Sequence, residues 1–306
     1  MENDLYLRNK DIKNRVKAAF IFVIFTMVVS QLLSPVLPFL HGSAAMIIGT
    51  VIILCGRLKP EKGSLTEVNN KMTGTAFVVV LGAFMIAKLL SLIPSAALVS
   101  LFVNENNAEA FQDLDTTKDN ILQAFIFMGL VTPFCEEAVF RGCIGKSFRK
   151  YGIWFAMLMS TLLFAIYHCN LFQLVSTFLP GIVLFYVALN YSLKWSVLLH
   201  FINNGLLVIG FVALKKIAPD SFFANYGEYI IESALAVAAL CLCKKDNALE
   251  KVKQFLSGPQ NEKGVYKAAI GNIWFILLII VFAIMTAMIL LMLDGSIDMT
   301  AIPAVS

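Results

Sequence analysis

Two adjacent glutamates interrupt an apolar stretch of the chain, in the run PFCEEAVFRG at residues 133–142. On a helix, Glu137 and Arg141 are four residues apart and share a face, so we expect them to pair. Glu136 points about 100° away and cannot join that pair well. It is therefore the candidate for acid–base chemistry, while Glu137 and Arg141 support it. Pro133 is expected to kink the helix. The alternative is a solvated turn at a membrane edge.

Two histidines and an asparagine in other apolar stretches could complete an acid–base site. His168 ends the run FAIYH, and His200 begins the run HFINN. Histidine is the side chain best suited to share a proton near neutral pH. His200 and Asn204 share a helix face, and two donors aimed at one point could stabilise an oxyanion. Taken singly, each residue also fits an ordinary role, as an interface histidine or as a hydrogen bond between helices.

Three other polar features are given no chemical role. Lys88 lies inside an apolar stretch, and its long stem could carry the ammonium toward the membrane surface. His41 precedes a Gly-Ser pair and is expected to be an exposed turn residue. The six cysteines lie in or beside apolar runs without a CxxC pair, and we expect buried reduced thiols.

The composition indicates what kind of element must position these residues. Of 306 residues, 59% are apolar and only 14% are charged. A soluble domain rarely has so few charges, because its surface must remain hydrated. Runs of about 20 apolar residues cross a bilayer as helices, which satisfy their own backbone groups. This excludes a soluble enzyme and a nucleic-acid-binding protein. We predict an all-α polytopic transmembrane helical bundle.

About eight or nine spans are expected, in a single integral membrane domain covering residues 1–306. The second is short enough to be re-entrant, and the third contains Pro94, where it could break. Residues 1–16 are expected to form a cytoplasmic tail, 104–120 an acidic loop and 244–267 a basic cytoplasmic loop. The candidate spans are 17–40, 43–56, 72–103, 121–140, 152–169, 171–191, 195–214, 229–243 and 268–293.

Lysine and arginine are distributed unevenly between the two sides of these spans. With a cytoplasmic N-terminus, 20 of the 24 fall on the cytoplasmic side and 3 on the other, and Lys88 lies within a span. Cytoplasmic loops carry an excess of Lys and Arg. We therefore predict a protein of the plasma membrane with its N-terminus in the cytoplasm.

Straight spans would not bring the candidate residues together. Glu136 falls near the middle of its span, His168 near the outer end and His200 near the inner end. Either the turn after His168, at Cys169 and Asn170, lies within the bilayer, or the span limits differ from those given above.

The three motifs together resemble those of the CAAX protease and bacteriocin-processing family, also called the Abi family of intramembrane endopeptidases. They are Glu-Glu-x-x-x-Arg at 136–141, Phe-x-x-x-His at 164–168 and His-x-x-x-Asn at 200–204. The resemblance covers about residues 117–214, which we take as the catalytic core. It implies a helical bundle around a hydrated cavity within the membrane. The implied activity is hydrolysis of a peptide bond in a membrane-associated peptide or protein, in CAAX-type or in leader- or signalling-peptide processing.

The resemblance also implies a role for each motif residue. Glu136 and His168 would activate a water, and His200 and Asn204 would hold the oxyanion. The supporting residues would be Glu137, Arg141 and Phe164.

The metal requirement has two readings. The family was first described as metal-dependent, and Glu136, His168 and His200 could in principle bind zinc. The sequence lacks a His-x-x-x-His pair, so three separate helices would have to supply the ligands. We favour a mechanism without a cofactor.

Two other functions compete with the protease. One is a non-catalytic membrane regulator or bacteriocin-immunity scaffold on the same fold. The presence of all the catalytic residue types argues against it. The other is a transporter in which buried glutamate and histidine relay protons, although no inverted repeat supports it. The expected partners are the lipid bilayer and a membrane-associated peptide or protein substrate, with no nucleic acid.

Overall fold

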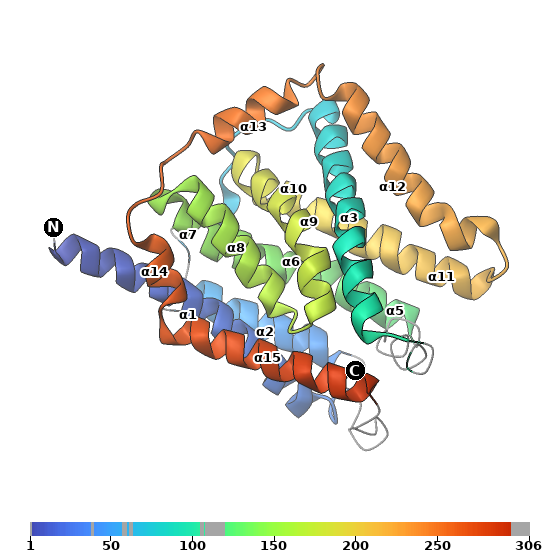
Figure 1. Cartoon of the computed structure of the whole chain (residues 1–306), viewed down its shortest axis with the longest axis horizontal. Coiled ribbons are helices and arrows are strands. Elements are labelled where there is room, and N and C mark those ends of the chain that lie inside the picture. The colour runs from blue at the N-terminus through green and yellow to red at the C-terminus, as the bar shows by residue number, and fades with distance from the viewer. Residues whose placement is uncertain are drawn as a thin grey trace.

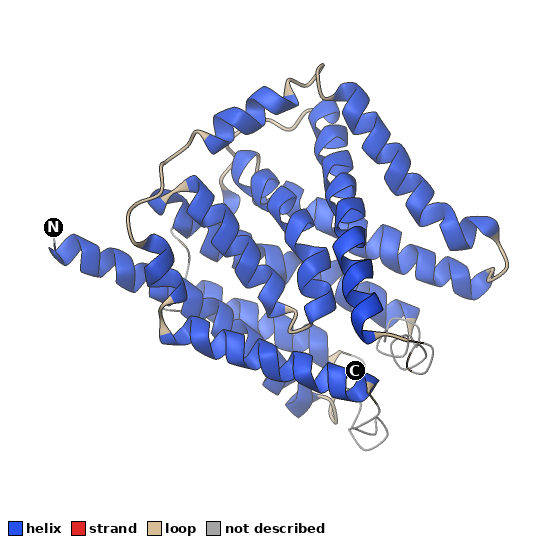
Figure 2. Ribbon diagram, viewed as in Figure 1, coloured by secondary structure: helices blue, strands red, loops and turns tan. Residues whose placement is uncertain are grey.

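The computed structural model describes residues 2–37, 40–56, 60, 64–104, 107 and 120–294, and within them the chain is almost entirely helical (Figures 1 and 2). In this part of the chain, the strand-like pairing is a single isolated bridge between Val68 and Ser192. The predicted all-α bundle is therefore confirmed.

Long helices and short helical segments alternate along the chain. In order, they are α1 (Glu2–Leu33), α2 (His41–Cys55), η1 (Ser64–Thr66), α3 (Gly74–Phe102), α5 (Ile121–Ala124), η3 (Phe125–Val131), α6 (Thr132–Glu136), η4 (Glu137–Gly145), α7 (Lys146–Phe148), η5 (Arg149–Tyr151), α8 (Ile153–Tyr167), α9 (Leu171–Asn190), α10 (Leu193–Phe201), η6 (Ile202–Val208), α11 (Ile209–Ile217), α12 (Phe222–Leu242), α13 (Ala248–Leu256), α14 (Val265–Ile270) and α15 (Ile273–Leu293).

Six helical stretches in the described residues are long and apolar enough to cross a membrane. Two shorter apolar helices, α2 and α8, accompany them, which is consistent with the predicted polytopic protein. The six stretches are Asn3–Leu33, Gly74–Phe102, Ile121–Tyr151, Leu171–Asn190, Leu193–Ile217 and Ile273–Leu293. The α12 helix lies where a further span was expected, but it begins earlier and contains two glutamates.

Several predicted boundaries differ from the structure. The expected N-terminal tail, residues 1–16, is helical from Glu2 onward and continues into the first span as α1. Pro94 does not break the third span, because α3 runs on to Phe102. The basic segment 244–267 contains the α13 helix rather than only a loop. Most of the acidic segment 104–120 lies outside the described residues.

Wider, π-type turns run through the helices that carry two of the motifs. The segments η3 and η4 lie within the stretch Ile121–Tyr151, and η6 follows His200. The amide of Thr132 donates to the carbonyl of Phe127, five residues earlier. Pro133 follows directly, so the proline sits beside a wider turn and the helix continues past it. Single π turns occur often at functional sites.

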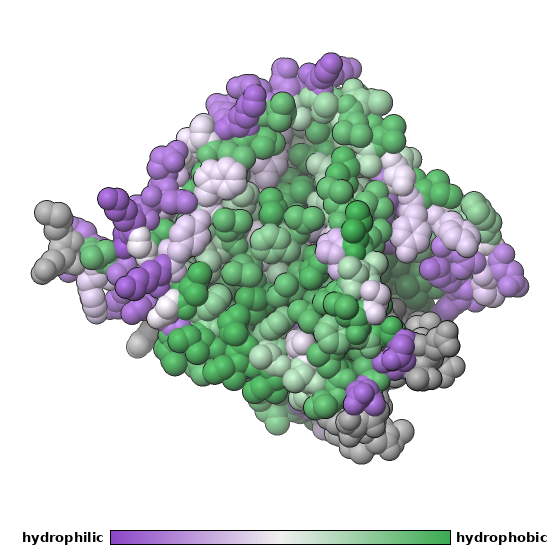
Figure 3. All heavy atoms as spheres, in the orientation of Figure 1, coloured by the Kyte–Doolittle hydropathy of each residue, from purple (hydrophilic) through white to green (hydrophobic). Residues whose placement is uncertain are grey.

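The motif-bearing helices lie in the interior of the bundle. The α9 helix packs against α3 and α8, while η4 contacts α1, α8, α9 and α10. In Figure 1, α8, α9 and α10 lie between α3 and α12 on one side and α1 and α15 on the other. The space-filling view shows an apolar surface over the helices, with hydrophilic residues gathered at its edges near α13 and near the end of α11 (Figure 3).

Two predictions about minor polar residues are wrong. His41 is only 3% exposed, because it starts α2 and its Nδ1 lies 2.7 Å from Oγ of Ser30 on α1. The cysteines are all free thiols, as expected, but only three of the six are buried. Cys55 and Cys241 are exposed, since they lie on outward faces of α2 and α12.

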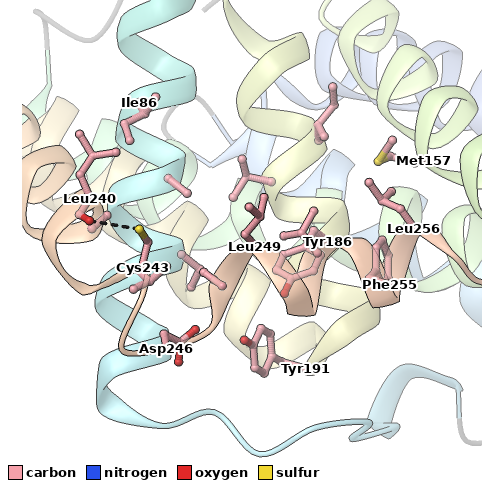
Figure 4. Close-up of a pocket in the computed structure, with 18 of the residues that line it drawn as sticks. Ile86, Met157, Tyr186, Tyr191, Leu240, Cys243, Asp246, Leu249, Phe255 and Leu256 are labelled. Atoms are coloured by element: carbon pink, nitrogen blue, oxygen red, sulfur yellow. Dashed lines mark hydrogen bonds between the residues drawn. The ribbon is translucent and has the colours of Figure 1, made fainter.

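An apolar groove of about 670 Å³ opens between α3, α8, α9, α12 and α13 (Figure 4). Its lining includes Ile86, Met157, Tyr186 and Leu249, and none of the motif residues faces it. The motif residues therefore do not line this groove.

The close packing of α3 on α12 generates a first prediction. A Cβ at Gly82 would lie 2.2 Å from the carbonyl oxygen of Leu235 and 2.4 Å from Cβ of Ala239. Gly82→Ala should therefore push the helices apart and lower the free energy of unfolding by about 1–3 kcal/mol. Gly210 on α11 is the matched control, because the nearest atom to a Cβ there is 4.0 Å away. Thermal unfolding in detergent should show a lower midpoint for Gly82→Ala alone, and equal midpoints would contradict this packing.

Candidate active site

Glu137 is the most heavily bonded carboxylate of the motif region. Its side chain is fully buried on η4, and Nη1 of Arg141 donates to its Oε1 at 2.9 Å. This is the pair expected from the four-residue spacing. The hydroxyl of Ser196 donates to Oε2, and Nδ1 of His200 lies 3.1 Å from Oε1. Glu137 therefore links η4 to α10 through two side chains.

Arg141 extends the same network to α8 and α9. Its Nη2 donates to the carbonyl of Gly181 at 3.3 Å, and its guanidinium lies 4.0 Å from the ring centroid of Phe164. A Cβ at Gly181 would come within 3.0 Å of Thr161 and 3.3 Å of Arg141, so glycine allows this approach. One buried ion pair thus fixes four helical segments relative to one another.

Glu136, the next residue, stands outside this network. It is only 2% exposed, and its buried Oε2 has no hydrogen-bond partner among the described residues. Nε2 of His200 lies 3.9 Å from that oxygen, which is too far for a direct hydrogen bond. A buried carboxylate without an internal partner is chemically available, as expected for the residue that points away from Arg141.

His200 lies between the two glutamates. A carboxylate that already accepts from Arg141 and Ser196 can only accept, so we assign the proton of the Glu137 contact to Nδ1 of His200. Nε2 is then the nitrogen directed toward Glu136. Glu137 orients the ring in the way that a second carboxylate orients a catalytic histidine.

His168 meets His200 through a shared aromatic ring. Nδ1 of His168 lies 2.9 Å from the carbonyl of Phe164, and because a carbonyl only accepts, Nδ1 donates and Nε2 keeps its lone pair. The Phe164 ring centroid lies 4.9 Å from that of His168 and 6.1 Å from that of His200. The Phe164 ring therefore lies against both histidines and against the Arg141 guanidinium.

The length of α8 bears on the depth at which His168 lies. Its fifteen residues rise about 22 Å, which is less than the roughly 30 Å of a hydrocarbon core. After His168 the chain turns through Cys169, whose φ is 49°, and Asn170 caps α9 by accepting from the amides of Phe172 and Gln173. A short α8 that ends in a turn at Cys169 and Asn170 is consistent with the first of the two alternatives, and the stretch Ile121–Tyr151, longer than the predicted span 121–140, with the second.

Asn204 is hydrogen-bonded to Met128 and Asn203 rather than to the other motif residues. Its Nδ2 donates to the carbonyl of Met128 on η3 at 3.3 Å, and its Oδ1 accepts from Asn203 at 2.8 Å. Within the described residues, neither bond reaches Glu136, His168 or His200. The contact lies where η3 and η6 cross closely, since a Cβ at Gly129 would be 3.0 Å from the Cα of Gly205. One amide hydrogen of Asn204 is left for another acceptor.

Ser196 is the site residue that the sequence analysis missed. Its hydroxyl is fully buried between the Glu137 carboxylate and the carbonyl of Leu184. A signal was present, because Ser196 precedes His200 by four residues and shares its helix face. The sequence alone did not indicate which helix that face would meet.

The proposed zinc ligands do not form a metal site in this geometry. Among the described residues, no group of three or more His, Cys, Asp or Glu side chains could hold a metal ion. Glu136, His168 and His200 are therefore not grouped as a three-ligand set among the described residues.

Comparison with known proteins covers the same part of the chain. The chain is 27% identical over 155 residues to an uncharacterized 24.3 kDa protein of Escherichia coli, a match that covers 47% of this chain and 66% of that protein. No solved structure matches. Residues 118–206, which contain all three motifs, match the model of the Rce1-like family, type II CAAX prenyl endopeptidases, and this confirms the family resemblance drawn from the motifs.

Proposed function

We propose that this integral membrane protein is an intramembrane endopeptidase in which Glu136 activates the attacking water. The family match supports a peptidase role and a membrane-embedded protein substrate. The observation that carries the mechanism is the buried, unpartnered oxygen of Glu136, 3.9 Å from Nε2 of His200 and next to the fully bonded Glu137. A CAAX-type substrate agrees best with the matched family, and leader or signalling peptides are the alternative.

The chemistry follows from the proton positions. Glu136 takes a proton from water as the water oxygen bonds to the carbonyl carbon, and Nε2 of His168 acts as the second base. The carbonyl oxygen becomes an oxyanion. When the C–N bond breaks, the proton held by Glu136 passes to the leaving nitrogen. Nε2 of His168 takes the second proton of the attacking water and then gives it to the amine, so the products are a carboxylate and an ammonium and both bases are restored.

Two donors are available for the oxyanion. His200 serves as a donor when its Nε2 carries a proton, with Nδ1 held by Glu137, and the second amide hydrogen of Asn204 is the other donor. Each such donor contributes typically 10²–10³ in rate. Ser196, Arg141 and Phe164 act by positioning these groups.

The orientation of the protein is part of the same proposal. We place the N-terminus in the cytoplasm, because 20 of 24 Lys and Arg residues then lie on the cytoplasmic side, and we propose the plasma membrane as its location.

Glu136→Gln tests the central role. It should lower cleavage of a prenylated CAAX peptide by at least about 10²–10⁴, because the general base is lost. The unfolding midpoint should change little, since the lost oxygen has no protein partner. Glu137→Gln is the matched control. It should lower activity, and it should also lower the free energy of unfolding by about 3–5 kcal/mol, because it leaves Arg141 buried without its counter-ion. Wild-type turnover by purified Glu136→Gln would refute the proposal.

Asn204→Ala tests whether Asn204 donates to the oxyanion or has only a structural role. If Asn204 holds the oxyanion, kcat should fall by about 10²–10³ with little change in KM. Asn203→Ala removes the neighbouring amide and should leave kcat of the folded protein near that of wild type. Equal kcat for both variants, with lowered unfolding midpoints, would assign Asn204 only to the η3–η6 contact.

Chelation tests the absence of a metal step. Cleavage by the purified protein should persist after extended dialysis against a strong zinc chelator, because the proposed proton transfers use only protein groups. Loss of activity that added zinc restores would show that a metal activates the water.

A further inference from the structure

A second group of ionisable side chains lies far from the three motifs along the chain. Lys88 stands at the midpoint of α3, and Glu232 stands at the midpoint of α12, one turn after Glu228. The sequence left open that the long stem of Lys88 could carry its ammonium toward the membrane surface. The structure contradicts this, because its ammonium is held between the two glutamates of α12.

The contacts of this cluster are unequal. Nζ of Lys88 donates to Oε1 of Glu228 at 2.8 Å and also to Oε1 of Glu232. The side chains of Lys88 and Glu228 are about one-fifth exposed, whereas that of Glu232 is 1% exposed. The second oxygen of Glu232, Oε2, is buried and has no hydrogen-bond partner among the described residues.

The charges of the cluster do not balance. One ammonium faces two carboxylates, and within the described residues these ion pairs involve no other side chain. The neighbouring α11 helix meets α12 with an aromatic ring, where Phe211 lies against Gly227. With all three groups ionised, a net negative charge would lie at mid-span, where a buried charge neutralises itself rather than remain unpaired.

We propose that this cluster is a proton-binding site, with the proton on Oε2 of Glu232. Lys88 and Glu228 then form a one-to-one ion pair, and the neutral acid of Glu232 accepts from Lys88 through its carbonyl oxygen. A metal cation fits less well, because hard cations take several oxygen ligands and the cluster offers one unpartnered oxygen beside an ammonium.

The bound proton would explain how α12 lies in the bundle. This helix carries two glutamates and is not among the six stretches that are apolar enough to cross a membrane. Neutralising the cluster removes the excess charge at the point where α12 packs on α3. The inference does not depend on the proposed peptidase activity.

Infrared spectroscopy of the full-length protein in lipid nanodiscs tests this site. The wild type should show the C=O band of a protonated carboxylic acid, and Glu232→Gln should lose it. Glu262→Gln is the control, because Glu262 is an exposed glutamate paired with Arg8, and the band should remain. A band that is unchanged in Glu232→Gln would overturn the proposal.

Thermal unfolding gives an independent readout. Glu232→Gln mimics the protonated acid and should keep the wild-type unfolding midpoint, whereas the double variant Glu228→Gln, Glu232→Gln leaves Lys88 unpaired and should lower that midpoint by several degrees.

A sodium titration tests the alternative ligand. A wild-type unfolding midpoint that rises with sodium, and no longer does so in Glu232→Gln, would replace the proton with an alkali cation. If Glu232→Gln does not fold, the infrared spectrum of Glu136→Gln is the test. That variant should retain the C=O band of protonated Glu232, and absence of the band would refute the proton-binding site.

Discussion

The arrangement of the candidate site depends on one buried ion pair, that of Glu137 and Arg141. Both side chains are fully buried, and a guanidinium in the interior of a membrane bundle is tolerated only when its charge and its donors are satisfied. The Glu137 carboxylate, the Gly181 carbonyl and the face of Phe164 meet most of this need from three helical segments, while Nε of Arg141 has no hydrogen-bond partner among the described residues. Such a pair contributes little net stability, since desolvation offsets the attraction. Its effect is to fix where η4, α8, α9 and α10 meet.

The same pair determines which glutamate is available. Because Glu137 is fixed by Arg141, Ser196 and His200, the adjacent Glu136 is directed elsewhere and keeps an oxygen without a partner. His200 contacts one carboxylate with one ring nitrogen and faces the other with the second. The bonds of Glu137 therefore set where the carboxylate of Glu136 lies relative to Nε2 of His200.

Local spacing explains what the sequence could predict. The Glu137–Arg141 pair and the shared face of His200 and Asn204 follow from four-residue separations on a helix. The partners of Lys88 could not be predicted in this way, because they lie 140 and 144 residues further along the chain. The burial of His41 and the bond of Asn204 to Met128 depend likewise on helix packing. The π turns have no periodic signature in the sequence, although they lie beside the motifs.

The two ionic clusters follow the same charge pattern but differ in their surroundings. Each has one cation, one bonded carboxylate and a second carboxylate whose Oε2 is buried without a partner, Glu136 in one and Glu232 in the other. Beside Glu136 stands the Nε2 of His200, 3.9 Å from the unpartnered oxygen. Beside Glu232 the described contacts offer only the ammonium of Lys88, which has no lone pair to receive a proton. This difference in surroundings is the reason for proposing an acid–base role for Glu136 and a held proton for Glu232.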